Sequence, residues 1–248
     1  MSLCAISASA LLFICTIIIL RIIHVLPATK FHDSNENGDG NGNGDMTKRS
    51  SPSATALLKD PTNKKLMILL GSGGHTGEMI RILSQFDNSI LNEFKKDYVI
   101  SSGDKTSILK IQEFQDIITK NNDTASNNSE YTIVPRARNV GESLFLSILH
   151  TLQSIIATFK ILLNKKLQNK LPDILLLNGP GTSVPLGYIL FLFKIFGLSN
   201  SKIVYIESLA RVKKLSLSGK LLKPISDRFI VQWEYLNVGR AEYYGILV

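Results

Sequence analysis

Beyond residue 64, short apolar runs alternate with longer stretches in which apolar residues recur every three or four positions. The short runs predict strands at Lys65–Leu70, Tyr98–Ser101, Tyr131–Val134, Asp173–Leu177, Lys202–Ile206 and Arg228–Val231. The periodic stretches predict helices at Thr76–Gln85, Thr106–Thr119, Gly141–Asn164, Val184–Phe196 and Lys213–Leu222. Because strands that alternate with helices are typical of βαβ units, we expect an α/β fold with a doubly wound, Rossmann-like parallel sheet over residues 65–232.

The first 26 residues form a separate apolar segment. No charged side chain occurs from Leu3 to Leu20, and after Arg21 the apolar run continues to Leu26, which approaches the roughly 20 residues needed to cross a bilayer. We therefore predict a transmembrane anchor over residues 1–26. A cleaved signal peptide is the alternative, but its usual basic start is absent. Positive charge appears only on the C-terminal side of the uncharged stretch, from Arg21 onward, so the positive-inside rule predicts a lumenal N-terminus and a cytosolic globular domain.

Residues 27–64 are predicted to be a flexible linker. Its centre, residues 33–45, reads DSNENGDGNGNGD and contains no apolar residue. Such a segment cannot offset the entropy of its ordering by burying apolar surface. We expect it to hold the globular domain near the membrane.

Composition narrows the classes of function. With 248 residues, 44% of them hydrophobic, the chain can bury one sizeable core and little more. The net charge of +8 suggests an anionic partner, such as nucleic acid, a phosphorylated substrate or an acidic membrane surface. Both cysteines, Cys4 and Cys15, lie in the N-terminal apolar run, so the remaining chain cannot form a disulfide or a cysteine metal site. The histidines are far apart in the chain, and we expect no metal and no cofactor.

Two glycine-rich loops are predicted at the carboxyl ends of strands, the edge at which ligands bind in such sheets. The first reads GSGGHTG over residues 71–77, and the second reads NGPGTS over residues 178–183. Glycines let a ligand approach the main chain, and N–H groups at the start of the next helix attract anions, which predicts a phosphate or diphosphate site. The spacing fits neither a dinucleotide fingerprint nor a Walker loop, which disfavours an oxidoreductase. The alternative is that the glycines only permit tight turns.

Two residues at this predicted edge are candidates for chemistry. His75 stands at the start of a predicted helix, where the helix dipole favours a neutral imidazole that can accept a proton or hydrogen-bond a sugar. A local hydrogen bond in the turn is its alternative role. Glu207 follows the fifth strand among basic residues, so it either orients a ligand or pairs with a neighbouring arginine.

Two further segments carry unusual apolar surface. In Leu144–Leu163 the polar residues fall on one narrow stripe of a helical projection, made of Ser147, His150, Thr151, Ser154 and Thr158. A buried helix and a helix docked on a membrane both fit this pattern. The last segment, residues 233–248, is rich in aromatic and aliphatic side chains, and it either docks onto a partner or folds back onto its own domain.

Three motifs, in order, resemble a known family. They read LGSGGHTGEM at residues 70–79, LLLNGPGTSVPLGY at 175–188 and IESLARVKKLSLSGKLL at 206–222. Together they are similar to the anchor subunit of the endoplasmic-reticulum UDP-N-acetylglucosamine transferase of asparagine-linked glycosylation. The resemblance covers residues 65–248 and fits the N-terminal anchor. It implies the N-terminal, acceptor-binding half of a GT-B glycosyltransferase, whose donor-binding half is a separate soluble protein.

Site roles follow from the resemblance and from the loops together. We expect His75 to act as base or orienting group for the attacking sugar hydroxyl. Substrate binding is expected at Gly71, Gly73, Gly74, Thr76, Asn178, Gly179, Pro180, Gly181, Thr182, Glu207 and Arg211. Partner docking is expected at Tyr243, Tyr244, Gly245, Ile246, Leu247 and Val248. The implied reaction transfers N-acetylglucosamine from UDP-N-acetylglucosamine, bound mainly by the partner, to dolichyl-diphosphate-N-acetylglucosamine, and adds the second sugar of the N-glycan precursor.

The resemblance also implies a cellular location and a requirement for a second subunit. The protein would lie in the endoplasmic-reticulum membrane and nuclear envelope, contact membrane lipid but no nucleic acid, and be inactive without its soluble catalytic partner. The length agrees, because a complete GT-B enzyme needs two Rossmann-like domains and this chain has residues for one. Two alternatives remain open: a non-catalytic membrane scaffold that only recruits a cytosolic partner, and a self-sufficient nucleotide-dependent enzyme.

Overall fold

The computed structural model describes residues 3–27, 64–120, 129–136 and 144–248, so the predicted linker lies outside the described residues except at its ends. The strands are β1 (Lys65–Leu70), β2 (Lys95–Ser101), β3 (Ser129–Val134), β4 (Ile174–Asn178), β5 (Lys202–Ile206), β6 (Arg228–Val231) and β7 (Ala241–Tyr243). The helices are α1 (Leu3–Val25), α3 (Gly74–Ser84), α4 (Asn88–Glu93), α5 (Lys105–Lys120), α6 (Leu144–Leu167), α7 (Ser183–Ile195) and α8 (Leu217–Leu222), with a 3-10 turn, η2 (Glu234–Leu236).

The seven strands form one sheet in the order β3-β2-β1-β4-β5-β6-β7, and every neighbouring pair is parallel. The chain leaves β1 toward β2 and β3 on one side, then returns to place β4 on the other side of β1. The carboxyl ends of β1 and β4 are therefore the topological switch point of the sheet, where ligands bind in open α/β folds. The predicted doubly wound parallel sheet is confirmed.

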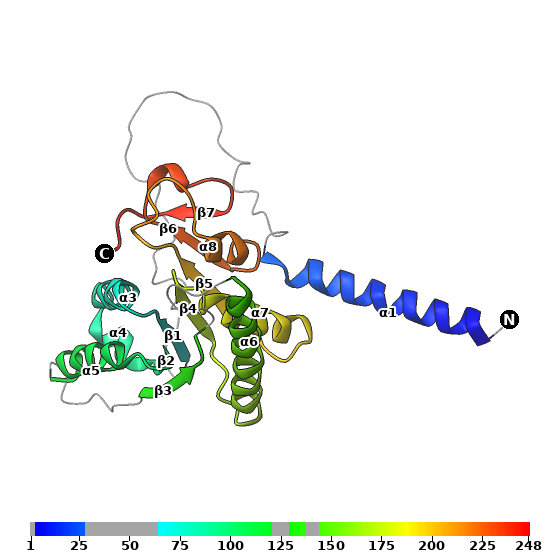
Figure 1. The fold of residues 1–248 in the computed structure, drawn as a ribbon, viewed down its shortest axis with the longest axis horizontal. Helices are drawn as coiled ribbons and strands as arrows, with labels where there is room; N and C mark the ends of the chain where they lie inside the picture. The colour runs from blue at the N-terminus through cyan, green and yellow to red at the C-terminus, as the bar shows by residue number, and fades with distance from the viewer. Residues whose placement is uncertain (1–2, 28–63, 121–128, 137–143) are drawn as a thin grey trace.

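Alternate residues of the strands enter two apolar cores, one on each face of the sheet. Helices α3, α4 and α5 cover one face, and α6, α7 and α8 cover the other (Figure 1). In β1, for example, Leu66, Ile68 and Leu70 join the first core, while Met67 and Leu69 join the second. Burial of strand residues on both faces is the reason that these strands read as continuous apolar runs.

The structure contains elements that the sequence did not predict, and several predicted strands and helices have shifted bounds. The short helix α4 and the edge strand β7 were not predicted, and the predicted helix Lys213–Leu222 is wrong in its first four residues. Ser216 has an extended backbone and caps α8, because its hydroxyl accepts a hydrogen bond from the Gly219 N–H at 2.9 Å. The helix therefore begins only at Leu217.

The N-terminal segment and α6 bear on the predicted membrane contacts. Helix α1 is 23 residues long, and its side chains from Leu12 onward are described. Within the described ranges, no helix combines the length and the hydrophobicity that crossing a membrane requires. For α6, the buried-helix alternative is wrong, because the apolar side chains on one side of the helix are exposed from Ile148 to Leu167.

Candidate functional site

The two glycine-rich loops lie against each other at the switch point. The Asn178 side-chain amide donates a hydrogen bond to the His75 carbonyl oxygen at 3.0 Å. A Cβ atom added to Gly71 would lie 2.6 Å from Cγ of Pro180, and one added to Gly179 would lie 2.2 Å from Cε1 of His75. Both glycines are therefore required by the close approach of the loops, and Gly179 also has a positive φ of 35°.

Other glycines of these loops have no packing reason of this kind. A Cβ atom added to Gly74, Gly77 or Gly181 would meet nothing within 4 Å, so these residues border open space. The first turn of α3 follows Gly73, the N-cap, which has no side chain that could cap the helix. Uncapped N–H groups beside open space are a chemical fit for an anion such as a phosphate.

Glu78, an acid that was not among the predicted site residues, orients the His75 side chain. His75 is partly exposed, and its Nδ1 lies 3.1 Å from Oε2 of Glu78. The other carboxylate oxygen, Oε1, accepts hydrogen bonds from the Ser208 hydroxyl at 2.8 Å and from the Leu209 N–H at 3.2 Å. A neutral imidazole that donates from Nδ1 to this carboxylate keeps Nε2 as its acceptor.

The Glu78 carboxyl is negatively charged at neutral pH. Burial acts to raise its pKa, but hydrogen bonds from His75, Ser208 and the Leu209 N–H outweigh burial and hold the pKa below the ordinary carboxyl value. A charged Glu78 favours the orientation in which His75 donates from Nδ1. The spacing of three residues on a helix is a signal that can place the two side chains together from sequence.

Buried hydroxyl groups hold the first glycine-rich loop in place. The Thr76 hydroxyl donates to the Gly71 carbonyl oxygen and lies 2.5 Å from Oγ of Ser107. Ser107 in turn donates to Asp104 at 2.6 Å, and its backbone N–H donates to the other oxygen of this N-capping aspartate. Thr182 is also buried, with its hydroxyl 3.5 Å from that of Ser101. Thr76 and Thr182 are thus placed to hold the loops in position, and Asp104 and Ser107 are supporting residues that the sequence analysis missed.

Asn178 carries an unusual polar atom. Its side chain is buried, and although the amide nitrogen bonds His75, the oxygen Oδ1 is buried with no hydrogen-bond partner in the described part of the chain. Buried acceptors of this kind are rare in folded proteins and call for a specific explanation. At this edge of the sheet, a ligand or an ordered water is the obvious donor.

Glu207, which directly follows β5, is buried. Its carboxylate accepts hydrogen bonds from the backbone N–H of Ser216 at 2.9 Å, the Ser216 hydroxyl at 3.0 Å and the Ser208 N–H at 3.1 Å. It therefore fixes the loop that also carries Ser208 to Glu78. Direct contact of Glu207 with a substrate stays a prediction, as does binding by Arg211, which lies exposed on this loop.

The C-terminal tail folds back onto its own domain, one of the two alternatives that the sequence left open. Tyr243 ends β7, the edge strand that pairs with β6. Leu247 donates from its N–H to Gln232 and accepts from the Gln85 side chain, at 3.2 and 2.8 Å. Leu247 and Val248 pack against the core on the α3 face, while the Ile246 side chain stays exposed. Docking of this tail onto a partner stays a prediction.

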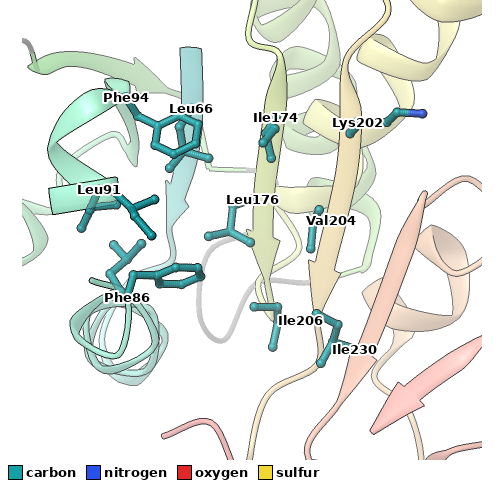
Figure 2. A pocket seen from close by; sticks show the side chains of 12 residues that line it. Leu66, Phe86, Leu91, Phe94, Ile174, Leu176, Lys202, Val204, Ile206 and Ile230 are labelled. Carbon is teal, nitrogen blue, oxygen red and sulfur yellow. The ribbon is translucent and has the colours of Figure 1, made fainter. Parts of the chain in front are cut away.

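An apolar pocket opens in the same core (Figure 2). It encloses about 110 Å³ between α3 and α4 on one side and strands β4, β5 and β6 on the other. Its lining is apolar apart from one lysine and consists of Leu66, Leu83, Phe86, Ile90, Leu91, Phe94, Ile174, Leu176, Lys202, Val204, Ile206 and Ile230. Such a surface suits an apolar segment of another molecule.

Fold and site together define a Rossmann-like α/β protein with a pair of phosphate-suited loops at its switch point. Comparison with known proteins places the chain more narrowly. Residues 66–247 match the family described as "Oligosaccharide biosynthesis protein Alg14 like", and the chain belongs to this family. The resemblance seen in the sequence is confirmed.

Related proteins carry the name "UDP-N-acetylglucosamine transferase subunit ALG14". The one from Debaryomyces hansenii is 55% identical over 185 residues, covering 74% of this chain and 76% of that protein. The one from Yarrowia lipolytica is 38% identical over 245 residues, covering 98% of this chain and 97% of that protein. The mouse protein is 38% identical over 188 residues, covering 74% of this chain and 83% of its own.

Solved structures show more distant similarity. MurG of Acinetobacter baumannii superposes with a TM-score of 0.47 at 11% identity, over 73% of this chain and 45% of that one. LpCGTa in complex with UDP gives a TM-score of 0.45 at 11% identity, over 75% and 53% of the two chains.

Proposed function

We propose that this chain is the membrane-anchoring, acceptor-binding subunit of a heteromeric UDP-N-acetylglucosamine transferase. It adds the second N-acetylglucosamine to dolichyl-diphosphate-N-acetylglucosamine at the cytosolic face of the endoplasmic-reticulum membrane. A separate soluble subunit supplies most of the donor site, so that this chain is one half of a GT-B enzyme and is inactive alone. Family membership supports the pathway, and the names of the relatives support the reaction.

The observation that carries the acceptor role is the pair of loops at the switch point. Gly74 and Gly181 each border open space, the first turn of α3 is uncapped, and the His75 side chain is partly exposed. A lipid-linked sugar presents a diphosphate, which suits the helix N-terminus, next to a sugar hydroxyl, which suits the histidine. The exposed cation Arg211 lies on a neighbouring loop and can add to the attraction for the diphosphate.

The chemistry of the step follows from these positions. Nε2 of His75 takes the proton of the attacking hydroxyl, while that oxygen forms a bond to the anomeric carbon of the donor sugar. The bond from this carbon to the UDP oxygen breaks, and UDP leaves from the partner's side of the cleft. A direct displacement of this kind inverts the anomeric centre. Glu78 remains charged and stabilises the imidazolium that forms.

Membrane attachment and recruitment complete the role. The uncharged run from Leu3 to Leu20 and the positive charges that follow it support a single-pass anchor with its N-terminus in the lumen. For the partner, the exposed Ile246 side chain and the apolar pocket on the α3 face each offer apolar surface. We expect the catalytic subunit to bind there.

The test is an assay of the full chain with its soluble partner, using UDP-N-acetylglucosamine and dolichyl-diphosphate-N-acetylglucosamine. The His75→Ala complex should assemble and lose about 100-fold or more in turnover, as expected for removal of a general base. Ser72→Ala, an exposed change in the same loop, is the matched control and should keep its activity. Full activity of the His75→Ala complex would instead favour a scaffold that only recruits its partner.

A further inference from the structure

Helix α6 exposes apolar side chains to solvent and turns polar side chains toward the domain, the reverse of an ordinary surface helix. Its outward face carries large apolar side chains that are all exposed, namely Ile148, Leu149, Leu152, Ile155, Ile156, Phe159, Leu163 and Leu167. Their spacing of three, four or seven residues forms one continuous stripe along the helix. The inward face is polar in the same half of the helix, where Ser154 and Thr158 are completely buried. A helix that only covers a sheet has the opposite arrangement.

The inward contacts fix α6 in this orientation. The Ser154 hydroxyl donates to the Pro135 carbonyl oxygen at 3.0 Å, and Nζ of Lys165 lies 2.7 Å from the Asp97 carboxylate in a mostly buried ion pair. Between them, Leu162 enters the core on the α7 face. Rotation of the helix to bury its apolar stripe would break each of these contacts. The exposed stripe is therefore a stable feature of the fold.

A second apolar helix is joined to the same layer. Val25, at the end of α1, is buried in the core that α6 and α7 share. The Arg21 guanidinium donates to the carbonyl oxygens of Ile195 and Lys194, at 3.1 and 3.3 Å, and so caps the last turn of α7. Helix α1 then runs away from the domain, and α6 runs across the direction of α1 rather than along it (Figure 1). These contacts of Arg21 and Val25 fix the orientation of α1 relative to α6 and α7.

We propose that the outward face of α6 lies on the cytosolic surface of the bilayer, a role that rests on the proposed membrane anchor. If α1 enters a membrane, its joint with α7 brings the adjoining surface to the level of the lipid headgroups. The exposed Phe196, directly after α7, continues the apolar surface from the joint. Helix α6 contains no acidic residue, and Lys160 and Lys166 are accessible to the headgroups of anionic lipids. Docking on the bilayer requires the apolar face of α6 to lie beside the end of the anchor helix α1, whereas docking on a protein does not.

Docking of α6 has a consequence for the acceptor. Helix α6 follows β3, so it starts from the carboxyl edge of the sheet, which is also the edge that carries the two glycine-rich loops. A bilayer that contacts the outward face of α6 therefore approaches this edge. The diphosphate of a lipid-linked sugar lies at the depth of the headgroups, so it can reach the loops while its lipid chain stays in the membrane.

The test measures contact of α6 with lipid in the full chain, reconstituted in phosphatidylcholine–phosphatidylserine vesicles. In a background with Cys4→Ser and Cys15→Ser, bimane is attached at Ile156→Cys on α6 or at Leu109→Cys on α5. Both positions are exposed, at 52% and 62%, but they lie on opposite faces of the sheet (Figure 1). Lipids with a nitroxide high on the acyl chain should quench bimane at residue 156 roughly threefold more than at residue 109, since interfacial helices insert their apolar face to that depth.

Equal quenching at the two positions would overturn the proposal. So would protection of residue 156 only after the soluble subunit is added, because that result identifies a protein interface. The quenching does not depend on turnover, so it still decides the question if the proposed transferase reaction fails. As a functional check, Leu152→Asn with Ile156→Asn should lower turnover of the vesicle-bound acceptor about tenfold. The same variant should spare turnover of a short-chain, water-soluble acceptor, and equal losses on both acceptors would contradict membrane docking.

Discussion

Glu78 provides the sharpest test of the chemistry at the site, because it contacts His75 and is expected to act through it. Glu78→Gln keeps the size of the side chain and removes its charge. The carbonyl oxygen of the substituted amide can still accept from Ser208 and Leu209, since that half of the side chain is unchanged in shape. The amide nitrogen then faces Nδ1 of His75, where the carboxylate oxygen lay at 3.1 Å. Two donors would oppose each other, so the imidazole must change its tautomer or its orientation.

The size of the effect follows from the bond that is lost. Hydrogen bonds to a charged group contribute about 1.5–3 kcal/mol, and the Glu78 side chain is largely shielded from solvent, so screening is limited. Since about 1.4 kcal/mol corresponds to a tenfold change in rate, kcat should fall roughly 10- to 100-fold. The KM for the lipid-linked acceptor should change by less than about threefold, because Glu78 faces the histidine and not the open space.

Steady-state kinetics of the complete complex measure this effect, and a double-mutant cycle tests the reasoning. If Glu78 acts only through His75, the double variant His75→Ala, Glu78→Gln should be no slower than His75→Ala alone. Ser208→Ala, which removes one hydrogen bond to Glu78 but none to His75, is the control for disturbance of the loop. Fully additive losses in the cycle would refute the role of Glu78 as a positioning residue.

Three further outcomes are expected. A Cβ atom at Gly179 would lie 2.2 Å from the imidazole, so Gly179→Ala should destabilise the fold by about 1–3 kcal/mol in thermal unfolding, whereas Gly181→Ala, which faces open space, should leave the melting temperature unchanged. The pKa of Glu78 is lowered on folding, so its contribution to stability is complete above pH 4.5 and is lost as the pH falls through the folded-state value; the melting temperature of Glu78→Gln should therefore decrease less on acidification than that of the natural protein. Ile246→Asp should abolish co-purification of the soluble subunit, whereas Leu217→Asp, at a more exposed position on α8, should not; retention by both variants would exclude the tail as the docking site.

The sheet was predictable because its strands are buried on both faces. Lys65–Leu70, Lys202–Ile206 and Arg228–Val231 were predicted with the bounds that the structure has. By contrast, β7 is only three residues long and α4 only six, which is too short for a repeating pattern to stand out from chance. Pairing with β6 holds β7 in place, and this is a tertiary contact that no local pattern encodes.

The candidate site was predictable in its loops but not in its supporting contacts. The glycines and His75 were visible as a motif, whereas the link from Glu78 to Ser208 joins residues 130 positions apart. Similarly, the periodicity of Leu144–Leu163 revealed a polar stripe but not the direction in which it points. The complete burial of Ser154 and Thr158, together with the hydrogen bond from Ser154 to the Pro135 carbonyl oxygen, shows that these residues face inward.

The central claim is that this chain supplies one wall of a reaction cleft and that a soluble subunit supplies the other. The most direct measurement compares transfer of N-acetylglucosamine from its UDP donor to the dolichyl-diphosphate acceptor by the purified chain, by the purified partner and by both in the same vesicles. We expect transfer only when both are present, together with saturable binding of the acceptor by this chain alone. Sustained transfer by this chain without a partner, or acceptor binding that requires only the partner, would contradict the claim.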